Sequence, residues 1–143
     1  MRIGARRQMH ADATGAGIAS PRVLDYDGDT LQGQGAPGVD IFGCMTRARE
    51  GELLSEPFSV AAFYFITREL LLRAGGFDEE FFLYNEEMDL SWRVWLAGAT
   101  INQVPSAKIH HQGASSGDRT VENRTNETKR FYANRNQLLT LLK

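Results

Sequence analysis

The N-terminal part of the chain alternates apolar runs with stretches rich in glycine and aspartate. "GIASPRVL" at residues 17–24 predicts a short buried strand interrupted by Pro21, because proline cannot donate a ladder hydrogen bond. "DYDGDT" at residues 25–30 predicts a turn, since Asp-Gly favours tight hairpins. Residues 6–13 have a mild helical pattern, and the glycine-rich residues 32–38 predict a loop.

The middle of the chain begins with a nearly continuous apolar run. "FSVAAFYFI" at residues 58–66 is typical of a central strand covered on both faces. Thr67 stands where it can cap a short helix, "RELLLRA" at residues 68–74. Gly75 and Gly76 follow at once and predict the end of that helix.

The next stretch, "GGFDEEFFLYNEEMDLSWRVWLAG" at residues 75–98, mixes acidic with aromatic residues. An N-cap at Asn85 predicts a helix that runs to Gly98 and holds Glu86 and Glu87 in its first turn, where the helix dipole favours carboxylates. Helical spacing separates a charged side from a side that can face the core. The charged side carries Glu86, Asp89 and Arg93, and the other carries Met88, Trp92 and Trp95.

The C-terminal part predicts two further strands and a helix. "TINQVP" at residues 100–105 and "AKIHH" at residues 107–111 are strand-like, whereas the polar residues 114–127 predict a mobile loop. Residues 128–143 predict an amphipathic helix, with Phe131, Arg135, Leu138 and Leu142 near helical spacing. Strands alternating with helices indicate an α/β layer architecture. The few strands, with no glycine-rich phosphate loop, indicate part of a larger sheet.

Composition narrows the class of protein. A chain of 143 residues suits one compact domain, and a net charge of −2 argues against binding driven by nucleic acid phosphates. Cys44 is the only cysteine, which excludes an intramolecular disulfide and fits a reducing compartment. The sequence contains neither a membrane-spanning run nor a secretory signal, so we expect a cytoplasmic location, compatible with the inner face of the plasma membrane.

The acidic helix start is the candidate for chemistry. Adjacent carboxylates at Glu86 and Glu87, held by nearby aromatic residues, form a candidate general-base site. The aromatic residues Phe77, Phe81 and Phe82 would anchor this segment beneath the fold. The residues alone leave the alternative open that the acids are only helix caps and surface charge.

Three stretches together resemble the C-terminal half of family 2 glycosyltransferases. They are residues 75–98 quoted above, "VPSAKIHHQG" at residues 104–113 and "RFYANRNQLL" at residues 130–139. The family pattern has Gly-Gly-Phe-Asp-Glu, Phe-Phe-x-Tyr, Glu-Asp-x-Asp-Leu and Trp-Arg segments, then Pro-x-Ala leading to a histidine, then an Arg-Asn pair. The closest subgroup is the rhamnosyltransferase-like enzymes of bacterial surface polysaccharide synthesis. Many positions agree in order, so this signal is more specific than one short motif.

The resemblance implies a GT-A fold and inverting transfer of a sugar from a nucleotide-sugar donor to an acceptor hydroxyl. The family's Glu-Asp pair, which supplies the catalytic base, corresponds to Glu86 and Glu87, so a glutamate stands where aspartate is usual. We take Glu87 as the first candidate for the base and Glu86 as the second. The extra methylene moves the carboxylate by about one bond, and a displacement of that size can lower a rate ~10²-fold.

Three further residues match the family on the acceptor side. Asp89 corresponds to a later aspartate, and it could brace Arg93 or touch the acceptor. Tyr84 could line the acceptor site, although packing is the alternative. Arg135 belongs to the Arg-Asn pair, and its guanidinium could bind a phosphate or act as a structural brace.

A divalent metal is also implied by the resemblance. His111 aligns with a histidine that can join the Mn²⁺ or Mg²⁺ holding the donor diphosphate. His110 is its neighbour, and on a strand the two side chains point to opposite faces, so only one should reach the site. The alternative for His111 is a surface histidine.

The family's N-terminal half, with its nucleotide-binding strands and Asp-x-Asp metal motif, has no counterpart in the sequence. Asp25 and Asp27 match the Asp-x-Asp pattern but lie in the predicted turn. We therefore expect residues 1–143 to be a single partial domain, the acceptor and catalytic-base half, which is inactive alone. It would be a truncated enzyme, one chain of a split enzyme, or a non-catalytic binding module. The expected partners are a nucleotide sugar, a glycan or lipid-linked acceptor, and the missing half or a second copy.

Overall fold

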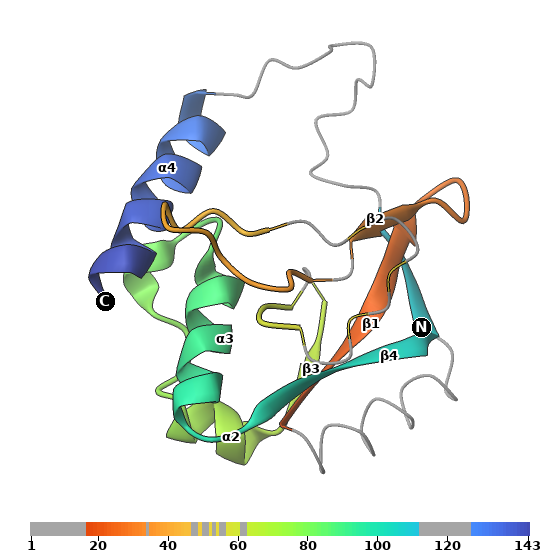
Figure 1. Ribbon diagram of the computed structural model, residues 1–143, viewed down its shortest axis with the longest axis horizontal. Helices are drawn as coiled ribbons and strands as arrows, with labels where there is room; N and C mark the ends of the chain where they lie inside the picture. Colours follow the sequence, from red (N-terminus) through yellow and green to blue (C-terminus); the bar gives the residue numbers. More distant parts are fainter. Residues whose placement is uncertain are drawn as a thin grey trace.

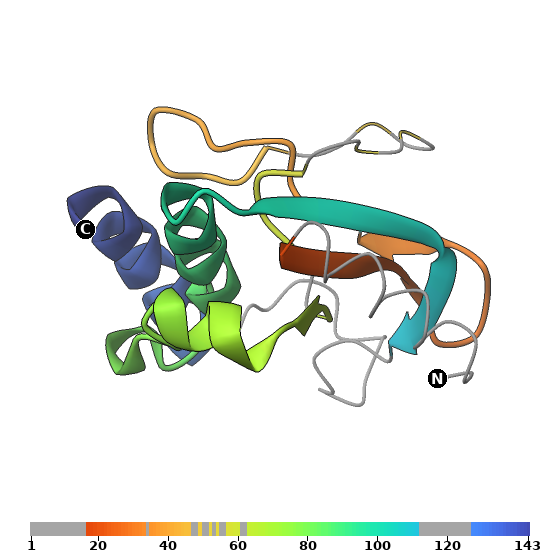
Figure 2. The same cartoon turned by 90° about the horizontal axis from the view of Figure 1, so that it is seen from below.

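The computed structural model describes residues 17–33, 35–46, 49, 52, 54, 57–60, 63–111 and 127–143. The helix expected over residues 6–13 and the loop expected over residues 114–126 lie outside these residues. The described chain is a mixed α/β structure, as predicted, with the helices gathered at one end of a four-stranded sheet (Figures 1 and 2). No helix among the described residues combines the length and apolarity needed to cross a bilayer.

Strand β1, Gly17–Asp25, is the centre of the sheet. Along one edge it pairs in parallel with β4, Thr100–His111, over its whole length. Along the other edge it pairs antiparallel with β3, Phe65–Ile66, at its start and with β2, Leu31–Gly33, at its end. The tight turn predicted after β1 joins it to β2.

Two prolines mark an irregularity between the parallel strands. The sequence predicted that Pro21 interrupts the strand, and the register of β1 with β4 does jump there: Pro21 pairs with Val104, whereas Arg22 pairs with Lys108. A proline lacks the N–H that a regular ladder needs, so the pairing is interrupted at the bond after Pro21. β4 absorbs the jump by bulging around Pro105 and remains one strand, where we predicted two.

The expected central strand over residues 58–66 is wrong. Of the described residues in this segment, 58–60 and 63–66, only Phe65 and Ile66 form a strand, β3, and Ser59 makes an isolated bridge to Ala36. The reason is that this segment packs against helix α3, Glu86–Leu96, instead of a strand. The indole of Trp95 donates to the Phe58 carbonyl at 3.0 Å, and the Val60 N–H donates to the Ser91 hydroxyl at 3.4 Å.

Helix α2, Arg68–Arg73, begins and ends as predicted. The Thr67 hydroxyl accepts the Leu70 N–H at 3.2 Å, which caps the first turn. Gly75 and Gly76 follow with φ of 88° and 73°, and such left-handed backbone is where glycine terminates a helix at least cost.

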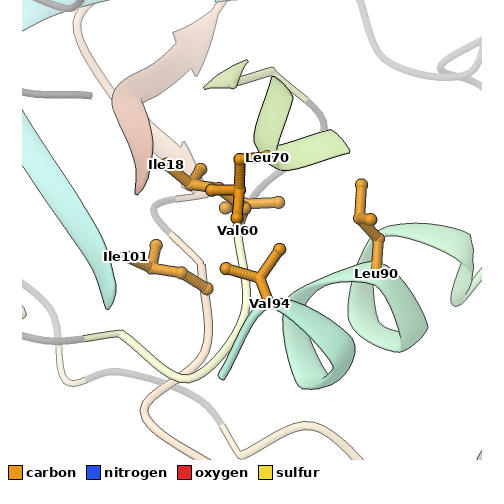
Figure 3. Packing of buried hydrophobic residues seen from close by; sticks show 6 residues of the cluster. All are labelled: Ile18, Val60, Leu70, Leu90, Val94 and Ile101. Carbon is orange, nitrogen blue, oxygen red and sulfur yellow. The ribbon is translucent and has the colours of Figure 1, made fainter. Parts of the chain in front are cut away.

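The main core lies where α2 and α3 meet the beginnings of the strands (Figure 3). Its buried members come from five different segments, which ties the helices to the sheet. They are Ile18, Val60, Leu70, Leu90, Val94 and Ile101.

Helix α4, Glu127–Leu142, packs beside α3 (Figure 1). Its polar side faces inward. Asn136 and Thr140 are buried, whereas Phe131, Leu138 and Leu142 are 61%, 62% and 82% exposed. The predicted helix is therefore confirmed. The apolar positions that share one side of it do not face the core.

Candidate functional site

A left-handed turn delivers the chain into α3. Tyr84 and Asn85 have φ of 68° and 66°, and two consecutive residues other than glycine in this region are uncommon. Asn85 occupies the N-cap position as predicted, but its side chain makes no capping hydrogen bond to the residues that the structure describes. The predicted cap chemistry is wrong because Asn85 adopts this left-handed conformation rather than the extended one of a capping residue.

Glu86 and Glu87 are the first residues of α3 and lie against each other. Burial raises the pKa of Glu87 to about 7. A hydrogen bond from its own backbone N–H opposes that rise, and the charge and side-chain hydrogen bond of Glu86 add to it. Two carboxyl groups share a hydrogen bond only when one of them is protonated. The pair therefore holds a proton near neutral pH.

One oxygen of this pair has no partner. Oε2 of Glu86 is buried and accepts no hydrogen bond from the described residues. A buried acceptor without a donor is costly, so the atom is suited to a ligand hydroxyl or a water.

Tyr64 is the third titratable group beside the pair. Burial, then the charges of Glu87 and Glu86, raise the pKa of its phenol to about 12. Its ring packs against the core cluster, so it forms a neutral wall next to the two acids. The sequence placed Tyr64 only in an apolar run and did not identify it.

Asp89 is buried and paired with Arg93. Its Oδ2 accepts from Nε at 3.0 Å and from Nη2 at 2.5 Å. Arg93 also donates to the carbonyls of Ala74 and Gly76, at the end of α2. The bracing contact that the sequence allowed for Asp89 is thus present, and it joins α3 to α2.

Arg135 and Tyr84 are both engaged in the loop before α3. Arg135 donates to the Glu80 carbonyl at 2.5 Å, and its guanidinium lies 5.7 Å from the centre of the Tyr132 ring. The Tyr84 carbonyl accepts from the side-chain amide of Asn136 at 2.7 Å. The sequence left two roles open for Arg135, and its contact with the Glu80 carbonyl is that of a structural brace.

The predicted anchors of the acidic stretch divide into one buried and two exposed. Phe81 is fully buried, whereas Phe77 and Phe82 are 51% and 76% exposed. Phe82 instead packs on the ring of Tyr132 from α4, 5.3 Å between centroids. The expectation of three anchors is wrong for Phe77 and Phe82.

His111 lies at the end of β4, at the opposite end of the sheet from the helices (Figures 1 and 2). Its Nδ1 is 2.7 Å from Oε1 of Gln32, and its ring packs edge-on against Phe63, 5.2 Å between centroids. The side-chain amide nitrogen of Gln32 faces the Asp25 carboxylate and the His111 carbonyl, so the amide oxygen of Gln32 faces the His111 ring. This oxygen accepts a hydrogen bond from Nδ1–H of His111, and Nε2 of the same ring therefore keeps its lone pair. Neighbouring side chains of a strand point to opposite faces, and the His110 ring accordingly contacts the Asp25 carbonyl instead.

The tautomer of His111 suits a metal ligand, but the described residues do not complete a ligand set. None of their His, Cys, Asp and Glu side chains form a group of three or more that could hold a metal ion. Glu86 and Glu87 are therefore not joined to His111 in such a group.

Comparison with known proteins relates part of the chain to a glycosyltransferase. N-acetylglucosaminyl-diphospho-decaprenol L-rhamnosyltransferase from two strains of Mycobacterium tuberculosis is 42% identical over 53 residues. The match covers 36% of this chain and 17% of that protein. No protein-family profile matches the sequence, and no solved structure does.

Proposed function

We propose that the chain carries the catalytic base of an inverting glycosyltransferase, with Glu87 as the base and Glu86 as its partner. The observation that carries this proposal is the half-buried Glu86–Glu87 pair, in which the pKa of Glu87 is about 7. A general base works best when its pKa lies near the operating pH. The partial identity with a rhamnosyltransferase supports sugar transfer over other base-catalysed reactions.

In the proposed reaction an ionised Glu87 takes the proton of the acceptor hydroxyl. The hydroxyl oxygen then forms a bond to the anomeric carbon of the donor sugar. The bond from that carbon to the nucleoside diphosphate breaks on the opposite face, so the configuration inverts. The buried Oε2 of Glu86, which has no partner among the described residues, could accept a hydrogen bond from a second hydroxyl of the acceptor.

The substrate classes belong to the same proposal. The matched relative is named for transfer of L-rhamnose to N-acetylglucosaminyl-diphospho-decaprenol. We propose a nucleoside-diphosphate deoxyhexose as donor and a polyprenyl-linked or polysaccharide acceptor, reached at the inner face of the membrane. A GT-A arrangement and His111 as a single metal ligand are parts of this proposal too.

Replacement of Glu87 tests the proposal. A strain lacking the gene is complemented with wild type, Glu87→Gln or Glu79→Gln, and its extract is assayed for rhamnose transfer to the polyprenyl-linked acceptor, so that any partner is present. Glutamine cannot take the proton, so we expect Glu87→Gln to lower transfer ~10²- to 10⁴-fold. Glu79 is exposed, and its replacement should leave transfer at the wild-type rate. Full transfer by Glu87→Gln would instead indicate a non-catalytic binding module.

A further inference from the structure

The buried side chain of Asn136 lies between α4 and the loop that leads into α3. It is fully buried. Its Nδ2 has two hydrogens, which donate to the loop carbonyls of Leu83 and Tyr84, each at 2.7 Å, and the Phe81 carbonyl lies 3.4 Å from the same nitrogen. The two short hydrogen bonds hold the loop against the helix.

The loop needs such a restraint. Tyr84 and Asn85 both take left-handed backbone, which is unfavourable for residues other than glycine. The Asn85 side chain makes no capping hydrogen bond to the described part of the chain that could hold the turn. Contacts made by the loop carbonyls must therefore maintain it, and Asn136 binds the carbonyl of Tyr84 itself.

The position of the acids depends on this turn. Glu86 and Glu87 follow it directly, so a change in backbone at Tyr84 or Asn85 would rotate the start of α3. Arg135 adds a second contact from α4, to the Glu80 carbonyl at 2.5 Å. Adjacent residues of α4 thus bind both ends of the same loop.

We propose that Asn136 is a positioning residue, whose amide holds the left-handed turn at Tyr84 and Asn85 and so fixes where Glu86 and Glu87 stand for acid–base work. The catalytic part of this inference rests on the proposed function. The geometric part does not.

The test follows the titration of Glu87 by carbon NMR of its side-chain carboxyl in the 143-residue chain. Three groups face that carboxyl or shape its titration: Glu86 on its own helix, Tyr64 from the segment before β3, and the Glu87 backbone N–H. If the turn relaxes, the pair separates and gains water. We therefore expect Asn136→Ala to lower the pKa of Glu87 from about 7 to below about 6.

Two variants separate positioning from general loss of stability. Thr140→Val removes a buried hydrogen bond one turn along α4, from the hydroxyl to the Asn136 carbonyl at 2.9 Å, and touches none of the three loop carbonyls. It should lower the melting temperature without moving the pKa of Glu87. Glycine adopts left-handed backbone readily, so Asn85→Gly in the Asn136→Ala background should restore the wild-type pKa. If Asn136→Ala does not fold, Asn136→Asp keeps the shape and removes the amide donor.

An unchanged pKa of Glu87 in the Asn136 variant would overturn the inference, as would an equal change in Thr140→Val. Failure of the proposed function looks different. In that case Glu87→Gln would keep full sugar transfer, while the titration still moved in the Asn136 variant.

Discussion

The Glu87 carboxyl is buried beside a second acid, and this placement fixes how its charge depends on pH. Its pKa of about 7 in the folded chain lies above the ordinary value of 4.5 for a glutamate. A folded state that binds a proton more tightly than the unfolded state is stabilised at low pH. The contribution is complete below about pH 4.5 and is lost as pH rises to about 7.

The corresponding prediction is that Glu87→Gln flattens the pH dependence of stability. The difference between the two pKa values corresponds to about 3 kcal/mol. Glutamine stays neutral at every pH, so this loss is absent in the variant. Between pH 4 and pH 8, the free energy of unfolding of wild type should therefore fall more than that of Glu87→Gln, by up to ~3 kcal/mol. Urea denaturation at pH 4, 6 and 8 measures this.

Glu79→Gln serves as the matched control, because it makes the same chemical change at an exposed position of the same acidic stretch. Its stability should follow the wild-type curve at all three pH values. Parallel curves for wild type and Glu87→Gln would show that the Glu87 carboxyl is not held as described.

At the scale of elements, α4 shows most clearly what helical spacing can and cannot predict. The spacing identifies the residues that share a side of the helix, but not which side meets the protein. Here the loop before α3 offers carbonyl acceptors, so the side with Asn136 and Thr140 packs inward.

The burial of these two helices predicts very different losses of unfolding free energy for two leucine truncations, a large loss in α3 and a small one in α4. Leu90 of α3 is 1% exposed, and Leu90→Ala should cost about 2–5 kcal/mol of unfolding free energy. Leu138 of α4 is 62% exposed, and Leu138→Ala should cost under ~0.5 kcal/mol. Denaturant titration of both variants compares them directly. A cost above ~2 kcal/mol at Leu138 would mean that α4 packs its apolar side inward.

The elements that the sequence predicted well are those fixed by local chemistry. Helix α2 is one, because Thr67 and the Gly75–Gly76 pair act within a few residues of it. β3 and the single long β4 depend on pairing with β1, far away in the sequence, so apolar runs alone misjudged their lengths. In the site, adjacent glutamates at a helix start were predictable, but Tyr64 lies beside them, and Asn136 binds the loop before them, only through tertiary packing.

At the scale of the whole molecule, the sheet and core act as a rigid base for one acidic helix start. α3 is fixed on one side by the core, and on another by the Asp89–Arg93 pair that reaches α2. α4 then holds the loop before it. The chain spans about a sixth of the length of the curated relatives that it matches.

The pH dependence of sugar transfer tests the central claim most directly. The base must be ionised to accept a proton, so kcat/KM for rhamnose transfer in complemented extracts should rise with pH, with a midpoint near the Glu87 pKa of about 7. Glu87→Gln should lose both the activity and this dependence. A profile without a midpoint near 7, with transfer retained in Glu87→Gln, would contradict the assignment of Glu87 as the base.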